Sequence, residues 1–126
     1  MRIKASLKYL RMAPRKVRKI ADLIRGLNIS EAQYQLKYSS KRAAGPILKL
    51  LSSAIAQLKE KNLDVKNFYI YKITVDGGPM FKRLRLHSRG QAHIVRKRTS
   101  HVNLELEEKK PFVSKREKTP PIAPVR

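Results

Sequence analysis

The segment from Gly77 to Leu104 contains no acidic residue, and this feature limits most strongly what the chain can fold into. The segment begins at a turn signal, Asp76-Gly77-Gly78-Pro79. A second turn signal, Ser88-Arg89-Gly90, lies near its middle, with a candidate strand on either side. Gly90 can take a positive φ at such a turn. The pattern therefore predicts the two strands of a long β-hairpin at about residues 78–100. Its permanent cations are Lys82, Arg83, Arg85, Arg89, Arg96, Lys97 and Arg98.

The predicted hairpin is not apolar enough along its middle to lie on a hydrophobic core. Successive side chains of a strand point to opposite faces, so cations fall on both. The first strand places Lys82, Leu84 and Leu86 on one face, and Phe81, Arg83, Arg85 and His87 on the other. Such a ribbon repels itself unless a polyanion surrounds it. The sequence therefore indicates nucleic acid as its surroundings.

The charge of the whole chain supports this interpretation. Its 126 residues include 30 Lys and Arg against 9 Asp and Glu, which gives a net charge of +21 and an isoelectric point near 10.8. An ordinary enzyme gains nothing from such self-repulsion, whereas a protein that neutralises phosphates gains affinity through counterion release. The length predicts one domain with a modest core.

Several classes of protein and site are disfavoured by what the sequence lacks. There is no cysteine for a disulfide or a thiolate metal site, and no apolar stretch approaches the roughly 20 residues that span a bilayer. The N-terminal residues do not resemble a targeting sequence, and no basic amphipathic helix suggests a membrane partner. We expect the protein to stay where it is made, in the cytoplasm, or in the stroma or matrix if the host is an organelle.

Periodicity predicts a mixed body in front of the hairpin. Residues 3–9 alternate as a half-buried strand. A first helix follows from Pro14, with Val17, Ile20, Ala21 and Ile24 at helical spacing, and stops at Gly26. Its outer face carries Arg15, Lys16, Arg18, Lys19 and Arg25.

Two more helices and two more strands complete the predicted body. A short helix starts at Ser30 and ends near residues 38–40, and a longer one covers about 41–61, where Gly45-Pro46 either kinks it or marks its start. In the next strand Tyr69, Tyr71, Ile73 and Val75 alternate with Ile70, Lys72 and Thr74. The last strand places Val102, Leu104 and Leu106 opposite His101, Asn103 and Glu105.

The predicted fold class is α+β: three helices packed on a small three-stranded antiparallel sheet, with a long protruding basic hairpin and a disordered C-terminal tail. The globular RNA-binding domain, hairpin included, is expected to span residues 1–106. Residues 107–126 are rich in Glu, Lys and Pro, so we expect that they cannot bury enough apolar surface to order themselves.

Neither a metal site nor a catalytic site is predicted. His87 and His93 have no Asp, Glu or Cys near them in sequence, and metal sites usually need three or four ligands. The only clustered carboxylates, Glu105, Glu107 and Glu108, lie at the junction with the tail. We therefore expect no cofactor, no metal, no catalytic residue and no small-molecule substrate.

The densest basic cluster is Arg96-Lys97-Arg98-Thr99-Ser100-His101. It is either a solubilising edge strand or a phosphate track, in which guanidinium groups grip phosphates and the hydroxyls and imidazole add hydrogen bonds. The charge around it favours the track. The predicted RNA-binding residues are Arg11, Arg15, Lys16, Arg18, Lys19, Arg25, Lys82, Arg83, Arg85, Arg89, Arg96, Lys97, Arg98, Thr99, Ser100 and His101.

Several segments together resemble the bacterial large ribosomal subunit protein 22 family. They are Pro14-Arg15-Lys16-Val17-Arg18 with Ala21-Asp22-Leu23-Ile24-Arg25-Gly26, Ser53-Ala54-Ile55-Ala56, Val75-Asp76-Gly77-Gly78-Pro79, and Lys97-Arg98-Thr99-Ser100-His101. The resemblance covers about residues 1–106. It implies an RNA-binding assembly protein without enzymatic activity, on the outer surface of the large subunit, whose hairpin threads through ribosomal RNA.

The same resemblance implies a second role for the hairpin tip. The residues Leu86, His87, Ser88, Arg89, Gly90, Gln91 and Ala92 would line the peptide exit tunnel. The implied partners are large-subunit ribosomal RNA, neighbouring ribosomal proteins and the nascent polypeptide near the tip.

Two other classes remain as alternatives. An architectural DNA-binding protein also grips a duplex with basic β-arms, but such arms usually carry an apolar wedge at the tip, and Ser88-Arg89-Gly90-Gln91 offers none. A basic enzyme acting on nucleic acid would need a carboxylate cluster within the folded body to hold metal ions.

Overall fold

A computed structural model describes residues 1–109 of the chain. The strands are β1 (Arg2–Leu10), β2 (Phe68–Gly77), β3 (Phe81–Leu86), β4 (Ala92–Lys97) and β5 (Ser100–Glu108). The helices are α1 (Pro14–Ile24), α2 (Ile29–Tyr38) and α3 (Ala44–Glu60), with short 3₁₀ turns at Val65–Asn67 and Ser88–Gly90. The tail expected at 107–126 lies, from residue 110 on, outside the described residues.

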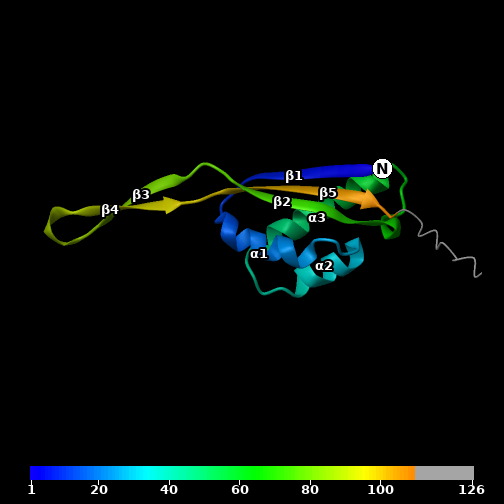
Figure 1. Cartoon of the computed structure of the whole chain (residues 1–126), viewed down its shortest axis with the longest axis horizontal. Helices are drawn as coiled ribbons and strands as arrows, with labels where there is room; N and C mark the ends of the chain where they lie inside the picture. Colours follow the sequence, from blue (N-terminus) through cyan, green and yellow to red (C-terminus); the bar gives the residue numbers. More distant parts are fainter. Residues whose placement is uncertain (110–126) are drawn as a thin grey trace, which may run out of the picture.

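The body is a three-stranded antiparallel sheet in the order β1-β5-β2, covered by helices on one face. In β5 the alternate residues Val102, Leu104 and Leu106 are buried, which confirms the predicted pattern for this strand. Strands β3 and β4 form a separate two-stranded ribbon that extends away from the body, at the end opposite the N-terminus (Figure 1). The predicted α+β class is confirmed.

Helix α1 begins and ends as the sequence predicts. Pro14 opens the helix, where a missing N–H costs no hydrogen bond, and Val17, Ile20, Ala21 and Ile24 are buried. Gly26 follows the C-cap with φ +79°. Its N–H donates to the Ile70 carbonyl at 3.0 Å, so the end of α1 is fixed to β2.

The start of α2 differs from the prediction, whereas one of the two alternatives for α3 is confirmed. Helix α2 begins at Ile29, and its N-cap is Asn28 rather than Ser30, since the Asn28 N–H donates to Glu31 Oε2 at 3.4 Å. Helix α3 begins at Ala44, so Gly45-Pro46 lies in its first turn and marks its start. A proline is tolerated there because these N–H groups have no partner within the helix.

Strand β2 contains a β-bulge that the sequence prediction missed. The register against β5 shifts between Ile70 and Lys72, so an extra residue, Tyr71, interrupts the alternation. Ile70 and Ile73 therefore share the buried face, and Tyr71 is exposed. The strand is confirmed, but the regular alternation predicted for it, with Ile70 on the same side as Lys72 and Thr74, is interrupted by the bulge.

Strand β5 extends two residues beyond the expected start of the tail. Glu107 and Glu108 are still paired within the sheet, opposite Arg2 and Phe68 among others. The Glu107 carboxylate accepts a hydrogen bond from Arg2 Nε at 3.1 Å through Oε1, and one from the Tyr69 hydroxyl at 3.1 Å through Oε2. The strand therefore includes the first two residues of the expected tail, because these two polar contacts give its end partners that its composition does not reveal.

The Glu107 contacts change the pKa values of the groups that make them. Burial alone would raise the pKa of the Glu107 carboxyl, but the hydrogen bonds from Arg2 and Tyr69 outweigh it and hold that pKa below its ordinary value. Burial, followed by the hydrogen bond to Glu107, raises the pKa of Tyr69. A carboxylate with a lowered pKa stabilises the fold above its unfolded-state pKa, about 4.3, and loses that contribution as the pH falls through its folded-state value.

We predict that Glu107→Gln lowers the free energy of unfolding at pH 7, and that its deficit against wild type shrinks as the pH falls below about 4.3. Urea unfolding at neutral and at acid pH measures both quantities. Glu60→Gln, which removes an exposed carboxylate at the end of α3, is the matched control and should show neither effect. A deficit that is independent of pH would show that the Glu107 contacts do not depend on its charge.

Candidate nucleic-acid interface

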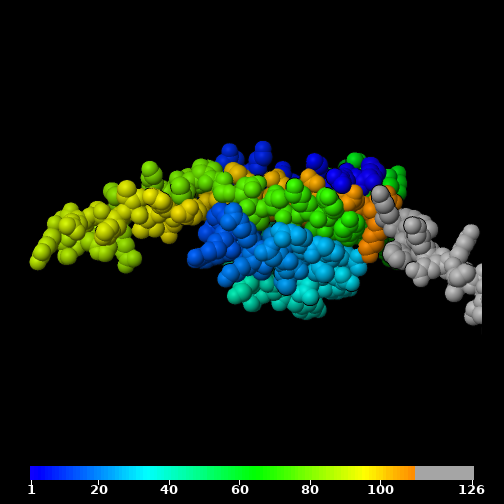
Figure 2. All heavy atoms as spheres, viewed as in Figure 1, coloured from blue at the N-terminus to red at the C-terminus, as the bar shows by residue number. Residues whose placement is uncertain are grey.

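The β3–β4 ribbon has no core beneath it, as predicted. The strands pair in a continuous antiparallel register from Phe81↔Lys97 to Leu86↔Ala92. Every residue of β3 is exposed, and in β4 only Val95 is partly buried. Figure 2 shows the ribbon as a narrow arm beyond the body. Nothing within the described residues therefore packs over either of its faces along most of its length.

The register assigns cations to both faces of the ribbon. One face carries the pairs Lys82↔Arg96, Leu84↔Ile94 and Leu86↔Ala92, and the other carries Phe81↔Lys97, Arg83↔Val95 and Arg85↔His93. Like charges placed directly opposite one another, as in the first pair, destabilise a sheet. The ribbon thus keeps an arrangement that is unfavourable in water and becomes favourable against a polyanion.

The tip is closed by a tight turn at Ser88–Gly90. The His87 N–H donates to the Gln91 carbonyl at 2.7 Å, and Gly90 takes the expected positive φ of +71°. Arg89 also has a positive φ, +61°, which the sequence did not indicate, because non-glycine residues adopt it uncommonly. The His87 and His93 rings meet edge to face with centroids 4.3 Å apart.

The hairpin root, residues 77–80 and 98–101, joins the ribbon to β2 and β5. Thr99 is buried, and its hydroxyl donates to the Pro79 carbonyl at 2.7 Å. Ser100 is fully buried as well, and its hydroxyl has no hydrogen-bond partner among the described residues. We therefore correct the predicted role of both residues: their hydroxyls are enclosed at the root and are not exposed as ligands for phosphate.

His101 belongs to the same internal arrangement. Its Nδ1 accepts a hydrogen bond from the Tyr9 N–H at 3.0 Å, and its ring packs edge to face on the Tyr9 ring. Tyr9 has a positive φ of +57° and lies where the register between β1 and β5 shifts. His101 thus fixes the end of β1 to the root, a role that its neighbours in sequence do not reveal.

Two predicted RNA-binding residues of α1 also have partners within the chain. Arg18 Nε donates to the Val75 carbonyl at 3.2 Å, and an Arg25 guanidinium nitrogen donates to the Ile73 carbonyl at 3.1 Å. Arg25 also pairs with Asp22 at 2.8 Å. Both carbonyls lie on the outer edge of β2, the edge that does not pair with β5. Because Arg18 and Arg25 donate hydrogen bonds to this edge, α1 shields it. Arg15, Lys16 and Lys19 remain exposed.

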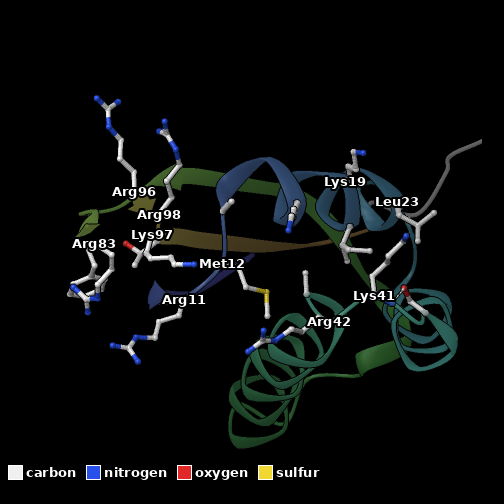
Figure 3. Close-up of a pocket in the computed structure, with 17 residues that line it drawn as sticks. Arg11, Met12, Lys19, Leu23, Lys41, Arg42, Arg83, Arg96, Lys97 and Arg98 are labelled. Carbon is white, nitrogen blue, oxygen red and sulfur yellow. Dashed lines mark hydrogen bonds between the residues drawn. The ribbon is translucent and has the colours of Figure 1, made fainter. Parts of the chain in front are cut away.

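A large concave surface lies between the body and the hairpin root, and we call it the basic hollow. It has a volume of about 1170 Å³. From the body it is lined by Arg11, Lys16, Lys19, Lys41 and Arg42. From the ribbon and root it is lined by Arg83, Arg96, Lys97 and Arg98. Figure 3 shows Met12 between Lys97 from the ribbon side and Arg42 from the body.

The basic hollow brings together residues that are far apart in sequence. Arg11, Lys16 and Lys19 meet the cluster at 96–98, whereas Arg85 and Arg89 lie farther out and do not line it. Lys41 and Arg42, in the connection between α2 and α3, were not among the predicted residues. Their basic character alone did not distinguish them among so many cations, and only the fold places them beside α1.

Two further findings concern other kinds of site. Within residues 1–109, no group of three or more His, Cys, Asp or Glu side chains is placed to hold a metal ion. In the same part of the chain, none of the helices is long and apolar enough to cross a membrane.

Comparison with known proteins decides the family. Residues 5–107 match the family model for ribosomal protein L22p/L17e. The protein named large ribosomal subunit protein uL22 from Bdellovibrio bacteriovorus is 46% identical over 110 residues, which is 86% of this chain and 100% of that protein. The protein of the same name from Halothermothrix orenii is 47% identical over 112 residues, 87% of this chain and 98% of that protein.

The chain belongs to the ribosomal protein L22p/L17e family. Its members are structural proteins of the ribosome, which agrees with the expectation that the chain is not an enzyme. The match of residues 5–107 includes the whole ribbon and root, so the acid-free segment lies within the region that defines the family.

The geometry of the root in this L22p/L17e chain predicts an asymmetry between neighbouring glycines. A Cβ on Gly78 would lie 2.4 Å from Thr99 Oγ1 and 3.1 Å from His101 Nε2, whereas one on Gly77 would meet nothing within 4 Å. We expect Gly78→Ala to cost about 1–3 kcal/mol of unfolding free energy, as overpacking does, and Gly77→Ala to cost much less. Thermal unfolding of the two variants tests this, and equal losses would show that the root is not tightly packed at Gly78.

Proposed function

We propose that this protein is a structural component of the large ribosomal subunit that binds large-subunit ribosomal RNA and supports assembly of the subunit. The arms of the ribbon and the basic hollow bind RNA, and neighbouring ribosomal proteins contact the body. The tip, Leu86 to Ala92, lies at the wall of the peptide exit tunnel, where the nascent polypeptide passes. The protein is therefore ribosome-bound.

The observation that carries the RNA-binding proposal is the uncompensated charge of the ribbon. The acidic residues with ion-pair partners in the sheet are Glu105, Glu107 and Glu108, at its far end. Between Gly77 and Leu104 the chain supplies no carboxylate. Because the ribbon is exposed on both faces, RNA can reach its cations without any rearrangement of the body. The relatives named large ribosomal subunit protein uL22 support RNA of that subunit as the partner.

The placement of the tip is supported by the change of character along the ribbon. The arms carry Lys82, Arg83 and Arg85 on one strand, and Arg96, Lys97 and Arg98 at the end of the other. On one face the pairs toward the tip, Leu84↔Ile94 and Leu86↔Ala92, are apolar, and Leu86 is 82% exposed. The clustered cations of the arms favour surroundings rich in phosphate. The tip has fewer cations and favours surroundings with fewer phosphates. The tip therefore fits a tunnel wall better than an RNA anchor.

Replacing Arg96, Lys97 and Arg98 by Gln should weaken binding to large-subunit RNA. Each lost phosphate contact lowers the salt dependence, so the slope of log K against log salt should fall by about two to three units. Binding titrations at several salt concentrations measure this. A matched control replaces three exposed lysines at and after the end of α3, Lys59, Lys61 and Lys66, by Gln. This variant should leave the slope nearly unchanged. Equal slopes for both triple variants would show that Arg96, Lys97 and Arg98 do not contact phosphates and are only solvent-exposed charges at the edge of a strand.

The arm and the tip should have separable roles. Removing Ser88 to Gln91 and closing the turn with Asn-Gly keeps the hairpin register plausible, and it should leave incorporation into subunits nearly intact. It should also change the arrest caused by tunnel-sensing peptides. Replacing Lys82, Arg83 and Arg85 by Gln should do the reverse and reduce subunit occupancy. If the tip deletion loses occupancy as severely as the arm variant, the tip is an RNA anchor and its assignment to the tunnel fails.

A further inference from the structure

The floor of the basic hollow is apolar, and phosphate binding alone does not account for it. Between the cations the hollow is lined by Met12, Ile20, Leu23, Ala43 and Phe81. Leu23 is 48% exposed and Phe81 is 42% exposed. Apolar surface left in water costs free energy, and a phosphate oxygen gains nothing by contact with it. The occupant of the hollow should therefore offer an apolar or aromatic surface as well as negative charge.

Arg11 and Phe81 pack against each other at one side of the hollow, with the guanidinium group over the ring, and we call this pair the Arg11–Phe81 platform. The guanidinium carbon of Arg11 lies 5.4 Å from the centroid of the Phe81 ring. Phe81 is the first residue of β3 and pairs with Lys97, so the ribbon fixes the position of its backbone. Aromatic rings and Arg guanidinium planes are the groups on which proteins stack unpaired bases.

The rim of the hollow requires a polyanion. Lys16 and Lys19 come from α1, Lys41 and Arg42 from the α2–α3 connection, and no Asp or Glu lines the hollow. In the view of Figure 3, Lys97 and Arg42 reach toward Met12 from different sides, while Arg96 and Arg98 extend away from it. The volume of about 1170 Å³ exceeds the 300–1,000 Å³ typical of small-molecule sites, so it admits a nucleotide with its flanking phosphates.

We propose that the basic hollow binds a short unstacked segment of single-stranded RNA, with one base against Phe81, another against Leu23, and the linking phosphates on Lys16, Lys19, Lys41 and Arg42. The proposal rests on the proposed function, since the occupant is RNA, but it adds a base-contacting site to a surface otherwise suited only to phosphates. An acidic peptide with apolar side chains would match the same charge and floor. RNA is favoured because the Arg11–Phe81 platform suits a base and because the rim is continuous with the cations of the ribbon.

The test compares a labelled oligo-uridine strand with a blunt RNA duplex of equal phosphate count, by fluorescence anisotropy at fixed salt. Phe81→Ala should lose about tenfold in affinity for the single strand, the typical value of one base–aromatic stack, with no change in duplex affinity or salt slope. Phe81→Tyr keeps the ring and should bind like wild type. Tyr34→Ala removes an aromatic ring that is 64% exposed on α2, outside the hollow, and should also bind like wild type.

A second variant keeps the test independent of any effect of Phe81 on the ribbon. Leu23→Ser lies on α1 and should reduce affinity for the single strand in the same selective way, with an unchanged thermal unfolding curve. Equal losses on strand and duplex, or no loss on either, would overturn the base site. It would also be overturned if an acidic, Leu-containing peptide bound wild type but not Phe81→Ala while oligo-uridine binding stayed intact.

The failure of this proposal is distinguishable from the failure of the proposed function. If wild type does not bind large-subunit RNA with a steep salt dependence, the proposed function fails. If wild type binds that RNA but the floor variants do not separate strand from duplex, only the base site fails.

Discussion

Repulsion among its own cations is the constraint on which the rest of this structure depends. Among residues 1–109, the ion pairs of the sheet lie toward the end away from the ribbon, where Arg2, Lys4 and the N-terminal amino group pair with Glu107, Glu105 and Glu108. At the ribbon end the chain offers no carboxylate from Gly77 to Leu104. The cations of the ribbon thus have no carboxylate within that segment to pair with, and a polyanion is needed to compensate them. Because no core lies beneath the ribbon, the same polyanion is also what can cover its faces.

The body determines where the basic arm points. Strand β5 lies between β1 and β2, and β2 and β5 leave the sheet side by side at the hairpin root. The root is packed tightly: Thr99 bonds to Pro79, and a Cβ on Gly78 would collide with the Thr99 hydroxyl. Helix α1 occupies the other edge of β2 through Arg18 and Arg25, so these two cations serve the fold. The cations in and next to α1 therefore have two different roles. Arg18 and Arg25 hold the helix on the sheet that carries the arm, whereas Lys16 and Lys19 line the basic hollow.

The sequence predicted the features that depend on local patterns and missed those that depend on a partner in space. Alternation was sufficient for β1, β5 and the ribbon, and helical spacing with Pro14 and Gly26 was sufficient for α1. The bulge at Tyr71 depends on the register against β5, which no single strand reveals. Burial of Thr99 and Ser100, within the densest basic cluster, follows from close packing at the root. Lys41 and Arg42 join the hollow only because the fold places the α2–α3 connection beside α1.

Hydrogen–deuterium exchange of backbone amides, with and without large-subunit RNA, tests most directly the claim that the ribbon depends on a polyanion. Exposed strands with few buried contacts open readily, so in the free protein the amides of Arg85 and His93, which face the partner strand of the ribbon, should exchange much faster than those of Val102 and Leu104. On binding RNA, the ribbon amides should gain protection while the β5 amides change little. Ribbon amides that are as well protected as β5 in the free protein, or that stay unprotected in the complex, would contradict the account.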